Sequence, residues 1–386
     1  MAGFAKSDLK FVDYEKPWRY EEDGLTVTRG SAWSGPGCHL GCGVLLYTDK
    51  DGKLVKCEGD PDNPFNQGRL CMRCINIPEV TYHESRITSP MMRDPKDRGK
   101  DAWRKVSWDE ALDYVADKFL EIKEKYGAES VIFAQGTGRD IGPAITRLAW
   151  SYGSPNYTCI LSGLACFLPR IAGMALTTGT YMVADASQGW TDRYDNPEYH
   201  VPDVLVVWGD YPLIANNEGW YGHWAVDMMK RGTKIIDIDP KVTWLSAHSA
   251  KHLRIRPGTD AALALGILNI LIQENLYDRD FVEKWCYGFD ELRERAAEYP
   301  VERVSEITWI PEQDILDAVR MIGEADTASL QWGLAVDMTK ESLPASQAIA
   351  SIFMITGNID VPGGIIPTIA ILSYASGWGS ELMSDE

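Results

Sequence analysis

The chain has 386 residues, of which 45% are hydrophobic, and its formal net charge at pH 7 is −18. This length predicts about two or three domains with ample apolar material for a core. The negative charge argues against nucleic acid and anionic membrane surfaces as partners. No segment has the ~20 apolar residues of a membrane span. Residues 1–31 carry no visible export signal, so we expect a cytoplasmic protein.

Two cysteine pairs mark the first part of the chain. Three residues separate Cys38 from Cys42, and two residues separate Cys71 from Cys74. Such spacings let one tight turn aim two thiolates at one point, and two such turns make a four-thiolate site for zinc or an iron–sulfur cluster. The spacing alone does not choose between these metals, and a disulfide is a further alternative.

The segment between the two pairs has the pattern of a β-hairpin. A strand-like stretch at 44–48 is followed by the turn sequence Asp49-Lys-Asp-Gly52 and a second strand-like stretch at 53–58. A hairpin here brings the two cysteine turns together in space.

A helix is predicted after Ser107, which can cap its first turn, and it should end near Gly127. Its apolar face consists of Ala111, Leu112, Val115, Phe119 and Ile122. A buried strand at 131–135 and a helix at about 143–152 follow.

Strand, glycine turn and helix then recur along the chain. Strands are expected at 204–208, 234–239 and 330–332, with a helix at about 224–231. This alternation predicts a parallel sheet with helices on its faces, and ligands in such sheets lie beyond the carboxyl ends of the strands. A further helix at 261–274 can be capped by Thr259 or Asp260, and on its own it indicates no more than a well-capped surface helix.

The order of these motifs resembles the amino-terminal part of the large catalytic subunit of the dimethyl sulfoxide reductase family of molybdopterin enzymes. The motifs that carry the resemblance are the cysteine stretch with Gly-Asp-Pro-Asp-Asn-Pro and Gly-Arg-Leu-Cys71, Ser107-Trp-Asp-Glu-Ala-Leu112, Gly136-Thr-Gly-Arg139, Gly153-Ser-Pro-Asn156, Trp208-Gly-Asp-Tyr-Pro212, Ile238-Asp-Pro240, Arg256-Pro-Gly-Thr-Asp-Ala261 and Thr356-Gly-Asn358.

The resemblance implies a [4Fe–4S] cluster and a molybdenum or tungsten ion held by two pterin guanine dinucleotides, bis(molybdopterin guanine dinucleotide). It implies an α/β fold, with a small amino-terminal iron–sulfur β domain followed by Rossmann-like, doubly wound parallel-sheet domains. The family's carboxyl-terminal β-barrel is expected to be absent. The expected boundaries are 1–85 for the iron–sulfur domain, 86–160 and 161–335 for the α/β domains, and 336–386 for a returning segment.

For the cluster, the resemblance carries over to Cys38, Cys42 and Cys71. The first position of the family pattern is Gly35 here, and Cys74 stands where a glycine is usual, so we expect Cys74 to supply the fourth thiolate. Ser34 as an oxygen ligand, a three-iron cluster or no cluster are the alternatives.

The metal's protein ligand is expected at Cys166, about ten residues after Gly153-Ser-Pro-Asn156, because the family places its ligand there. Cys159 and Ser162 are nearby alternatives. A lone cysteine before a helix is otherwise a small buried apolar residue.

The remaining cofactor contacts follow from the same resemblance. Arg73 matches the basic residue between cluster and pterin, and Asp239 matches the acid that binds a guanosine ribose. The other positions expected to contact the dinucleotides are Gly138, Trp208, Gly209, Gly258, Thr259, Asp260, Trp332 and Gly333.

The implied activity is two-electron oxygen-atom or hydroxyl chemistry on a small molecule, with a ferredoxin-like electron-transfer subunit or a chain supplying the missing half as partner. The Gly-Cys-His-Leu-Gly-Cys42 variant and the many aromatic residues resemble the branch that acts on phenolic compounds. S-oxide, N-oxide, nitrate or polysulfide reduction and formate oxidation are the alternatives. A non-catalytic iron–sulfur electron carrier or cofactor-binding module is the alternative of another class.

Overall fold

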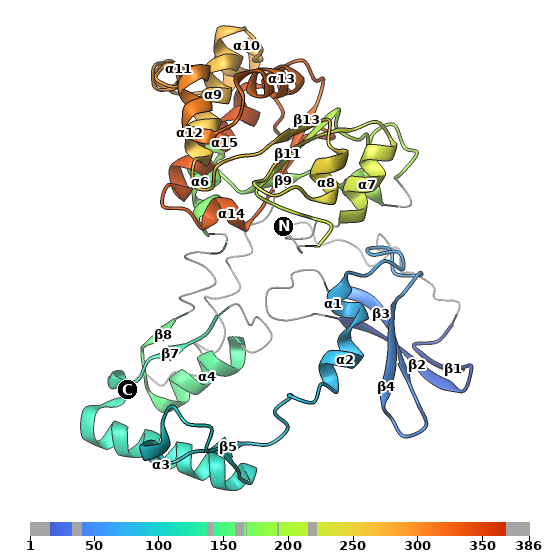
Figure 1. Cartoon of the computed structure of the whole chain (residues 1–386), viewed down its shortest axis with the longest axis vertical. Helices are drawn as coiled ribbons and strands as arrows, with labels where there is room; N and C mark the ends of the chain where they lie inside the picture. The colour runs from blue at the N-terminus through green and yellow to red at the C-terminus, as the bar shows by residue number, and fades with distance from the viewer. Residues whose placement is uncertain are drawn as a thin grey trace, which may run out of the picture.

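The computed structural model describes residues 16–32, 41–136, 142–158, 166, 168–190, 193–214 and 222–367. Figure 1 shows three groups of elements along the chain: an antiparallel sheet first, a small helical region next, and a larger α/β region last. The expected fold class is confirmed, because the chain is mixed α/β with a small amino-terminal sheet and a parallel sheet.

The amino-terminal sheet is antiparallel, with its strands in the order of the chain. Its strands are β1 (Arg19–Glu22), β2 (Leu25–Ala32), β3 (Cys42–Thr48) and β4 (Leu54–Gly59). The predicted hairpin is therefore confirmed as β3 and β4. Because successive side chains of β3 point to opposite faces of the sheet, Val44 packs in one small core and Leu45 in another. Each face of this sheet therefore buries only a few side chains.

Two short helices and a two-stranded ribbon lead away from this sheet. They are α1 (Met72–Ile75), α2 (Ile77–Thr81), β5 (Met91–Met92), η2 (Pro95–Asp97) and β6 (Arg104–Lys105).

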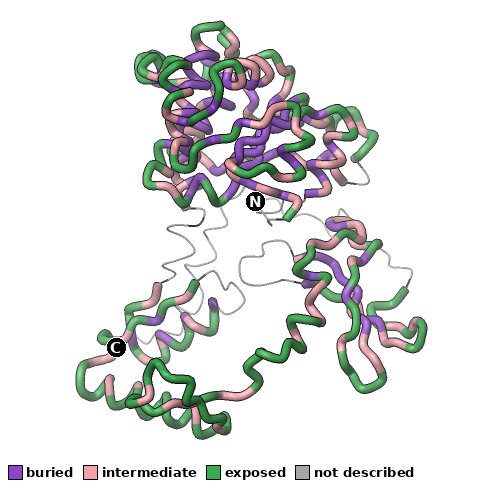
Figure 2. Tube along the Cα trace, viewed as in Figure 1, coloured by how far each residue is buried: buried purple, intermediate pink, exposed green. Residues whose placement is uncertain are grey.

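The next region holds the long helix α3 (Trp108–Tyr126), which starts and ends as predicted. The Ser107 side chain accepts a hydrogen bond from the Glu110 N–H and caps the helix. The apolar face of α3 is not buried among the described residues, with Leu112 58% exposed (Figure 2). The elements that follow are η3 (Ala128–Ser130), β7 (Phe133–Ala134), α4 (Gly142–Tyr152) and β8 (Tyr157–Thr158).

The strand predicted at 131–135 is shorter than expected. It reduces to β7, which pairs in parallel with β8. Ile132 is 64% exposed whereas Phe133 is buried, so the apolar run is covered on one side only. The helix predicted at 143–152 is confirmed as α4.

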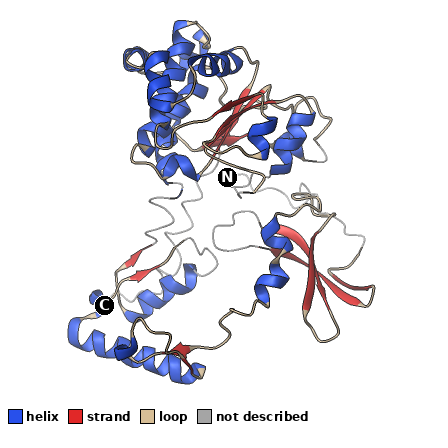
Figure 3. Cartoon of the chain, viewed as in Figure 1, coloured by secondary structure: helices blue, strands red, loops and turns tan. Residues whose placement is uncertain are grey.

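The parallel sheet has the order β12-β11-β10-β13. Figure 3 shows its strands in red with helices in blue packed around them. Its strands are β10 (Val204–Trp208), β11 (Lys234–Ile238), β12 (Lys251–Leu253) and β13 (Ala328–Trp332). All five residues of both β10 and β13 are buried. Strands that are buried along their whole length fit a sheet covered on both faces.

Helices cover both faces, which is the doubly wound arrangement. One face carries a large apolar core with Ile236 and Ile238, packed by α9 (Asp260–Gln273) and α15 (Ser342–Ile355). The other face carries Leu205 and Val207 under α7 (Gly222–Lys230) (Figure 1). The remaining elements are α6 (Leu168–Thr178), β9 (Met182–Ala184), η5 (Ser187–Gly189), α8 (Trp244–His248), α10 (Arg279–Trp285), α11 (Phe289–Ala297), α12 (Val301–Thr308), α13 (Glu312–Gly323), α14 (Leu334–Asp337) and β14 (Ile365–Pro367).

Candidate cluster and cofactor sites

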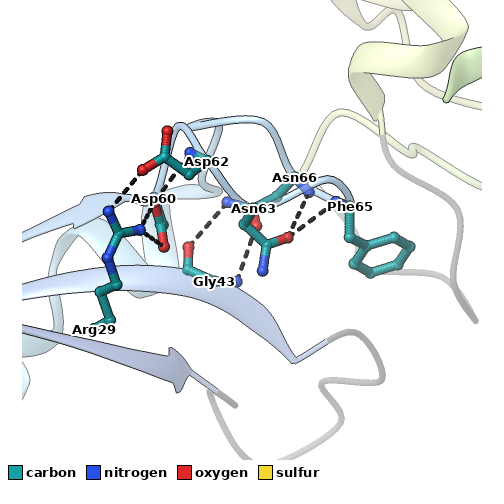
Figure 4. A network of polar contacts seen from close by, with 7 residues as sticks. All are labelled: Arg29, Gly43, Asp60, Asp62, Asn63, Phe65 and Asn66. Carbon is teal, nitrogen blue, oxygen red and sulfur yellow. Dashed lines mark hydrogen bonds and ion pairs between the residues drawn. The ribbon is translucent and has the colours of Figure 1, made fainter. Parts of the chain in front are cut away.

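The loop from β4 to the second cysteine pair is held by an ion-pair network. Nη1 of Arg29, on β2, lies 2.6 Å from both carboxylate oxygens of Asp60, and its Nη2 lies 2.6 Å from Asp62 (Figure 4). The side chains of Arg29 and Asp60 are 9% and 4% exposed. Because the Arg29 guanidinium bridges two carboxylates of the loop by charge-assisted hydrogen bonds, it fixes where the loop leaves the sheet.

Asn66 joins the two cysteine turns. Its Oδ1 accepts from the N–H of Gly43 at 2.9 Å, and its Nδ2 donates to the carbonyls of Gly43 and Arg69 at 3.0 and 2.9 Å. Gly43 directly follows Cys42, and Arg69 stands two residues before Cys71. The Asn66 side chain is fully buried. It therefore sets the separation of these two cysteines, a role that the sequence pattern alone did not reveal.

Two glycines allow the loop to approach the sheet. A Cβ at Gly43 would lie 2.3 Å from Nδ2 of Asn63, and a Cβ at Gly59 would lie 2.1 Å from the carbonyl oxygen of Gly68. A larger side chain would push the loop away from β3.

Three of the four predicted cluster cysteines come together. The Cys74 thiol is hydrogen-bonded to the thiols of both Cys42 and Cys71. Cys42 and Cys74 are 3% and 1% exposed. The fourth predicted ligand, Cys38, and the alternative Ser34 lie outside the described residues.

The pKa values of the two thiols in the Cys71–Cys74 turn are shifted in opposite directions. Hydrogen bonds from the Cys74 thiol and from the backbone N–H groups of Cys74 and Arg73 lower the pKa of Cys71 to about 5, with help from the Arg73 charge. The pKa of Cys74 is raised, because its thiol donates to its neighbours and is buried. A stabilised thiolate at Cys71 is the form that binds metal.

Within the described ranges, no group of three or more His, Cys, Asp or Glu side chains has a metal-binding arrangement. The Cys74 thiol is hydrogen-bonded to the thiols of Cys42 and Cys71, and sulfur donors of this kind fit a thiolate-bound metal by their chemistry. Cys57 is a further buried thiol near Cys42, on β4, that the sequence interpretation left out.

The second group of predicted residues lies at the carboxyl edge of the parallel sheet. Gly333 donates its N–H to the Trp208 carbonyl at 2.9 Å, and a Cβ at Gly333 would lie 2.4 Å from the Gly209 carbonyl oxygen. The Trp208 indole donates to Asp260 Oδ1 at 2.8 Å. The structure thus brings together the Trp208, Asp260 and Trp332 segments, which are far apart in the sequence.

Trp208 and Trp332 are 1% and 4% exposed as whole residues. Both indoles therefore pack inside the protein instead of facing a ligand. Asp239 uses its Oδ1 to accept from the Lys241 N–H at 2.7 Å. Thr259 donates to the Arg256 carbonyl instead of capping α9.

The Gly258 backbone is open, with nothing within 4 Å of a Cβ built on it and a φ of +83° that favours glycine. Gly138 lies outside the described residues.

Asp237 is a buried acid at this edge. It is 1% exposed, and neither carboxylate oxygen has a hydrogen-bond partner among the described residues. Burial, and then the charges of Asp239 and Asp210, raise the pKa of Asp237 to about 7. An orphaned buried polar group is expected where a ligand or water completes a site. The edge of the sheet therefore fits a hydrogen-bonding cofactor.

Cys166 is half-buried and stands two residues before α6. Its alternatives Cys159 and Ser162 lie outside the described residues. Assignment of the individual ligands stays a prediction.

The fold and the two sites define an α/β cofactor-binding protein with a cysteine-bearing amino-terminal sheet. The family model described as "Molybdopterin oxidoreductase Fe4S4 domain" matches residues 36–83, and the model described as "Molybdopterin oxidoreductase" matches residues 86–383. The chain belongs to the molybdopterin oxidoreductase family. This confirms the expected family and its cofactors, a [4Fe–4S] cluster and molybdopterin.

Curated relatives cover several activities. Acetylene hydratase of Syntrophotalea acetylenica is 32% identical over 83% of this chain and 42% of that protein. Formate dehydrogenase H of Escherichia coli (strain K12) is 30% identical over 86% of this chain and 45% of that protein. Dimethyl sulfoxide reductase DmsA of Haemophilus influenzae is 29% identical over 86% of this chain and 44% of that protein.

The same relationship holds in three dimensions. The solved structure of acetylene hydratase from Pelobacter acetylenicus superposes with a TM-score of 0.70 at 30% identity, covering 88% of this chain and 44% of that chain. The chain therefore spans less than half the length of these relatives. In the parts of the chain that the structure describes, no helix is long and apolar enough to cross a membrane.

Proposed function

We propose that this chain forms the cluster-binding and dinucleotide-binding part of a molybdopterin-dependent oxidoreductase that acts on a hydroxylated aromatic compound. The observation that carries the proposal is the contact of the Cys74 thiol with those of Cys42 and Cys71. It supports a cluster held by Cys38, Cys42, Cys71 and Cys74, with Cys74 in place of the ligand lost at Gly35.

The chain's own residues have two tasks in this function. The Asn66 contacts and the Arg29 network hold the cysteine turns at one separation, and the Arg73 charge favours the thiolate form of Cys71. At the sheet edge, we assign the Gly258 backbone and the Asp239 carboxylate to a guanine dinucleotide, and we assign Cys166 to the metal. When bound, the metal and its dithiolene ligands exchange two electrons with substrate while the cluster passes electrons singly.

The proposed reaction is reductive removal of a phenolic hydroxyl group. The aromatic C–O bond breaks, two electrons and two protons are consumed, and the products are the arene C–H and water. The sequence variant Gly37-Cys-His-Leu-Gly-Cys42 and the aromatic cluster of Phe65, Trp190 and Trp224 support this substrate class. An electron-transfer subunit supplies the electrons in the cell, and a reduced viologen can replace it in an assay.

Metal analysis and turnover test the proposal on anaerobically purified protein. Iron and molybdenum or tungsten should be present in the ratio that one cubane cluster and one metal require. Reduced methyl viologen should be oxidised with catechol-type substrates but not with dimethyl sulfoxide. Iron without molybdenum or tungsten would overturn the enzyme assignment in favour of an electron carrier. Turnover of formate or acetylene, but not of phenols, would overturn the substrate class.

Replacement of Cys74 tests the ligand set. Cys74→Ala should lower the iron content and abolish the cluster's electron paramagnetic resonance signal, whereas Cys286→Ala, at a half-buried thiol of the α10 end, should leave both unchanged. A native cluster in Cys74→Ala would move the fourth ligand to Ser34 or Cys57.

A further inference from the structure

A buried ion pair connects two parts of the chain that the sequence does not relate. Arg170 is the third residue of α6, and Asp337 is the last residue of α14. Arg170 Nε donates to Asp337 Oδ2 at 2.5 Å, and the Arg170 backbone N–H donates to Oδ1 at 3.0 Å. The two side chains are 3% and 0% exposed. Charge-assisted bonds in so dry a place are strong and directional.

Asp337 acts on α6 in two ways. Its carboxylate accepts from a backbone N–H in the first turn of the helix, where unpaired donors and the positive end of the helix dipole favour a negative charge. It also holds the guanidinium of the same residue. The first turn of α6, which begins two residues after Cys166, is therefore anchored to α14.

Arg170 also reaches the cofactor edge of the sheet. Its Nη1 donates to the Trp332 carbonyl at 2.7 Å, at the end of β13. The next residue, Gly333, donates to the Trp208 carbonyl at 2.9 Å. The Arg170 guanidinium thus links α6, the helix that follows Cys166, to the turns at Gly209 and Gly333 on the carboxyl edge of the sheet.

The rest of α6 has little freedom to move. Gly173 packs against α15 so closely that a Cβ on it would lie 2.6 Å from Cβ of Ser346. A helix fixed at this contact and at Arg170 has its axis and its rotation set.

We propose that Arg170 and Asp337 are a positioning pair that fixes Cys166 relative to the cofactor loop after β13. This inference rests on the proposed function, which assigns Cys166 to the metal. Neither residue touches the reacting atoms. Their effect is exerted through the start of α6, and the variants that test it are Arg170→Lys, which loses the planar fork, and Asp337→Asn, which loses the charge.

The first measurement uses the molybdenum-loaded enzyme. Both variants should retain molybdenum, show shifted g-values of the Mo(V) paramagnetic resonance signal, and lose about tenfold or more in kcat with little change in KM. The matched control is Arg320→Lys, in an exposed pair where Arg320 donates to Glu274 at 3.0 and 2.8 Å. It should keep the native spectrum and kcat. A lower unfolding temperature together with a native Mo(V) signal and native kcat would overturn the proposal, because that is the result of a purely structural pair.

The second measurement uses the cofactor-free protein. Hydrogen–deuterium exchange of the peptide covering residues 166–178 should be faster in both variants than in wild type and in Arg320→Lys. Unchanged exchange in both would overturn the proposal. Cys166→Ala separates the two claims. A native Mo(V) spectrum in Cys166→Ala overturns the ligand assignment itself, whereas an altered spectrum there with native spectra in both pair variants overturns only the positioning role.

Discussion

The amino-terminal sheet and the parallel sheet hold their predicted sites by different forces. The strands of the parallel sheet lie between two apolar layers, and its edge loops pack glycine against glycine. The amino-terminal sheet has two small apolar cores, and the loop before Cys71 is held by buried polar contacts of Arg29 and Asn66. Figure 2 shows the same contrast, with buried residues concentrated in the α/β region.

Because of this difference, we expect mutations in the two sheets to have different consequences. Apolar burial stabilises the parallel sheet whether or not a ligand is present, so losing it should cost folding free energy. Buried hydrogen bonds specify geometry and contribute less net energy each. Losing these hydrogen bonds should therefore lower the iron content of the protein before it unfolds the sheet. The predictions below test this contrast, from the largest expected effect to the smallest.

Ile236→Ala should lower the free energy of unfolding by about 4 kcal/mol, because it removes a fully buried side chain from the large core and leaves a cavity. The iron content of the protein that remains folded should stay native. Calorimetric unfolding and iron analysis measure the two effects. Val242→Ala, at a 70% exposed position near the same strand, is the control and should change neither. Loss of iron in Ile236→Ala would show that the two regions are not independent.

Asn66→Ala should lower the free energy of unfolding by about 3 kcal/mol, because it leaves the buried Gly43 N–H without its acceptor and removes the hydrogen bonds to the Gly43 and Arg69 carbonyls. Here the iron content should fall as well, since Cys42 and Cys71 lose their common tether. Asn76→Ala is the matched amide deletion, because Asn76 donates to the Met72 carbonyl in an exposed setting. Full iron occupancy in Asn66→Ala would refute the tether.

Gly43→Ala should cost about 2 kcal/mol, since its Cβ must displace the Asn63 side chain, and strain of this kind is of that size. Gly30→Ala, on the neighbouring strand, is the control, because its Cβ would lie 3.8 Å from Leu46 in ordinary contact. Urea unfolding of the two variants measures the difference. Equal midpoints would contradict the close approach of the loop.

Asp237→Asn should change the pH dependence of stability. The pKa of Asp237 is about 7 in the folded protein, against an ordinary value of 3.8. Between these values the folded protein holds a proton that the unfolded chain releases, so this group makes stability fall as pH rises through that window. The variant should therefore be more stable than wild type at about pH 8 and nearly equal to it at about pH 4.

Thermal unfolding of the cofactor-free protein across this range measures the effect. Asp326→Asn, at an exposed position before β13, serves as the control and should follow the wild-type curve. If the stability of Asp237→Asn depends on pH as that of wild type does, the Asp237 carboxyl of the wild-type protein is hydrated or paired in solution.

Local patterns in the sequence predicted much of the fold. The β3–β4 hairpin, the Ser107 cap and the parallel strands all depend on neighbouring residues, and each lies where the pattern placed it. The shortness of β7 and the exposed face of α3 could not be predicted, because burial depends on what packs there. The ties made by Asn66 and Arg170 were missed for the same reason. An asparagine in a turn-rich loop indicates only a turn, and Arg170 meets a partner 167 residues away.

The order of the strands has a consequence for how the protein is made. Val204 of β10 pairs with Ala328 of β13, and Met182 of β9 pairs with Pro367 of β14. At ~5–20 residues per second, the ribosome needs about 6–25 s to supply β13 after β10 has been synthesised. The hairpin that carries Cys42, by contrast, can form as soon as its own residues emerge. The order of biogenesis is therefore built into the topology: the cysteine-bearing sheet is ready to receive iron early, whereas a pterin cofactor has no complete edge to enter until synthesis has passed Trp332.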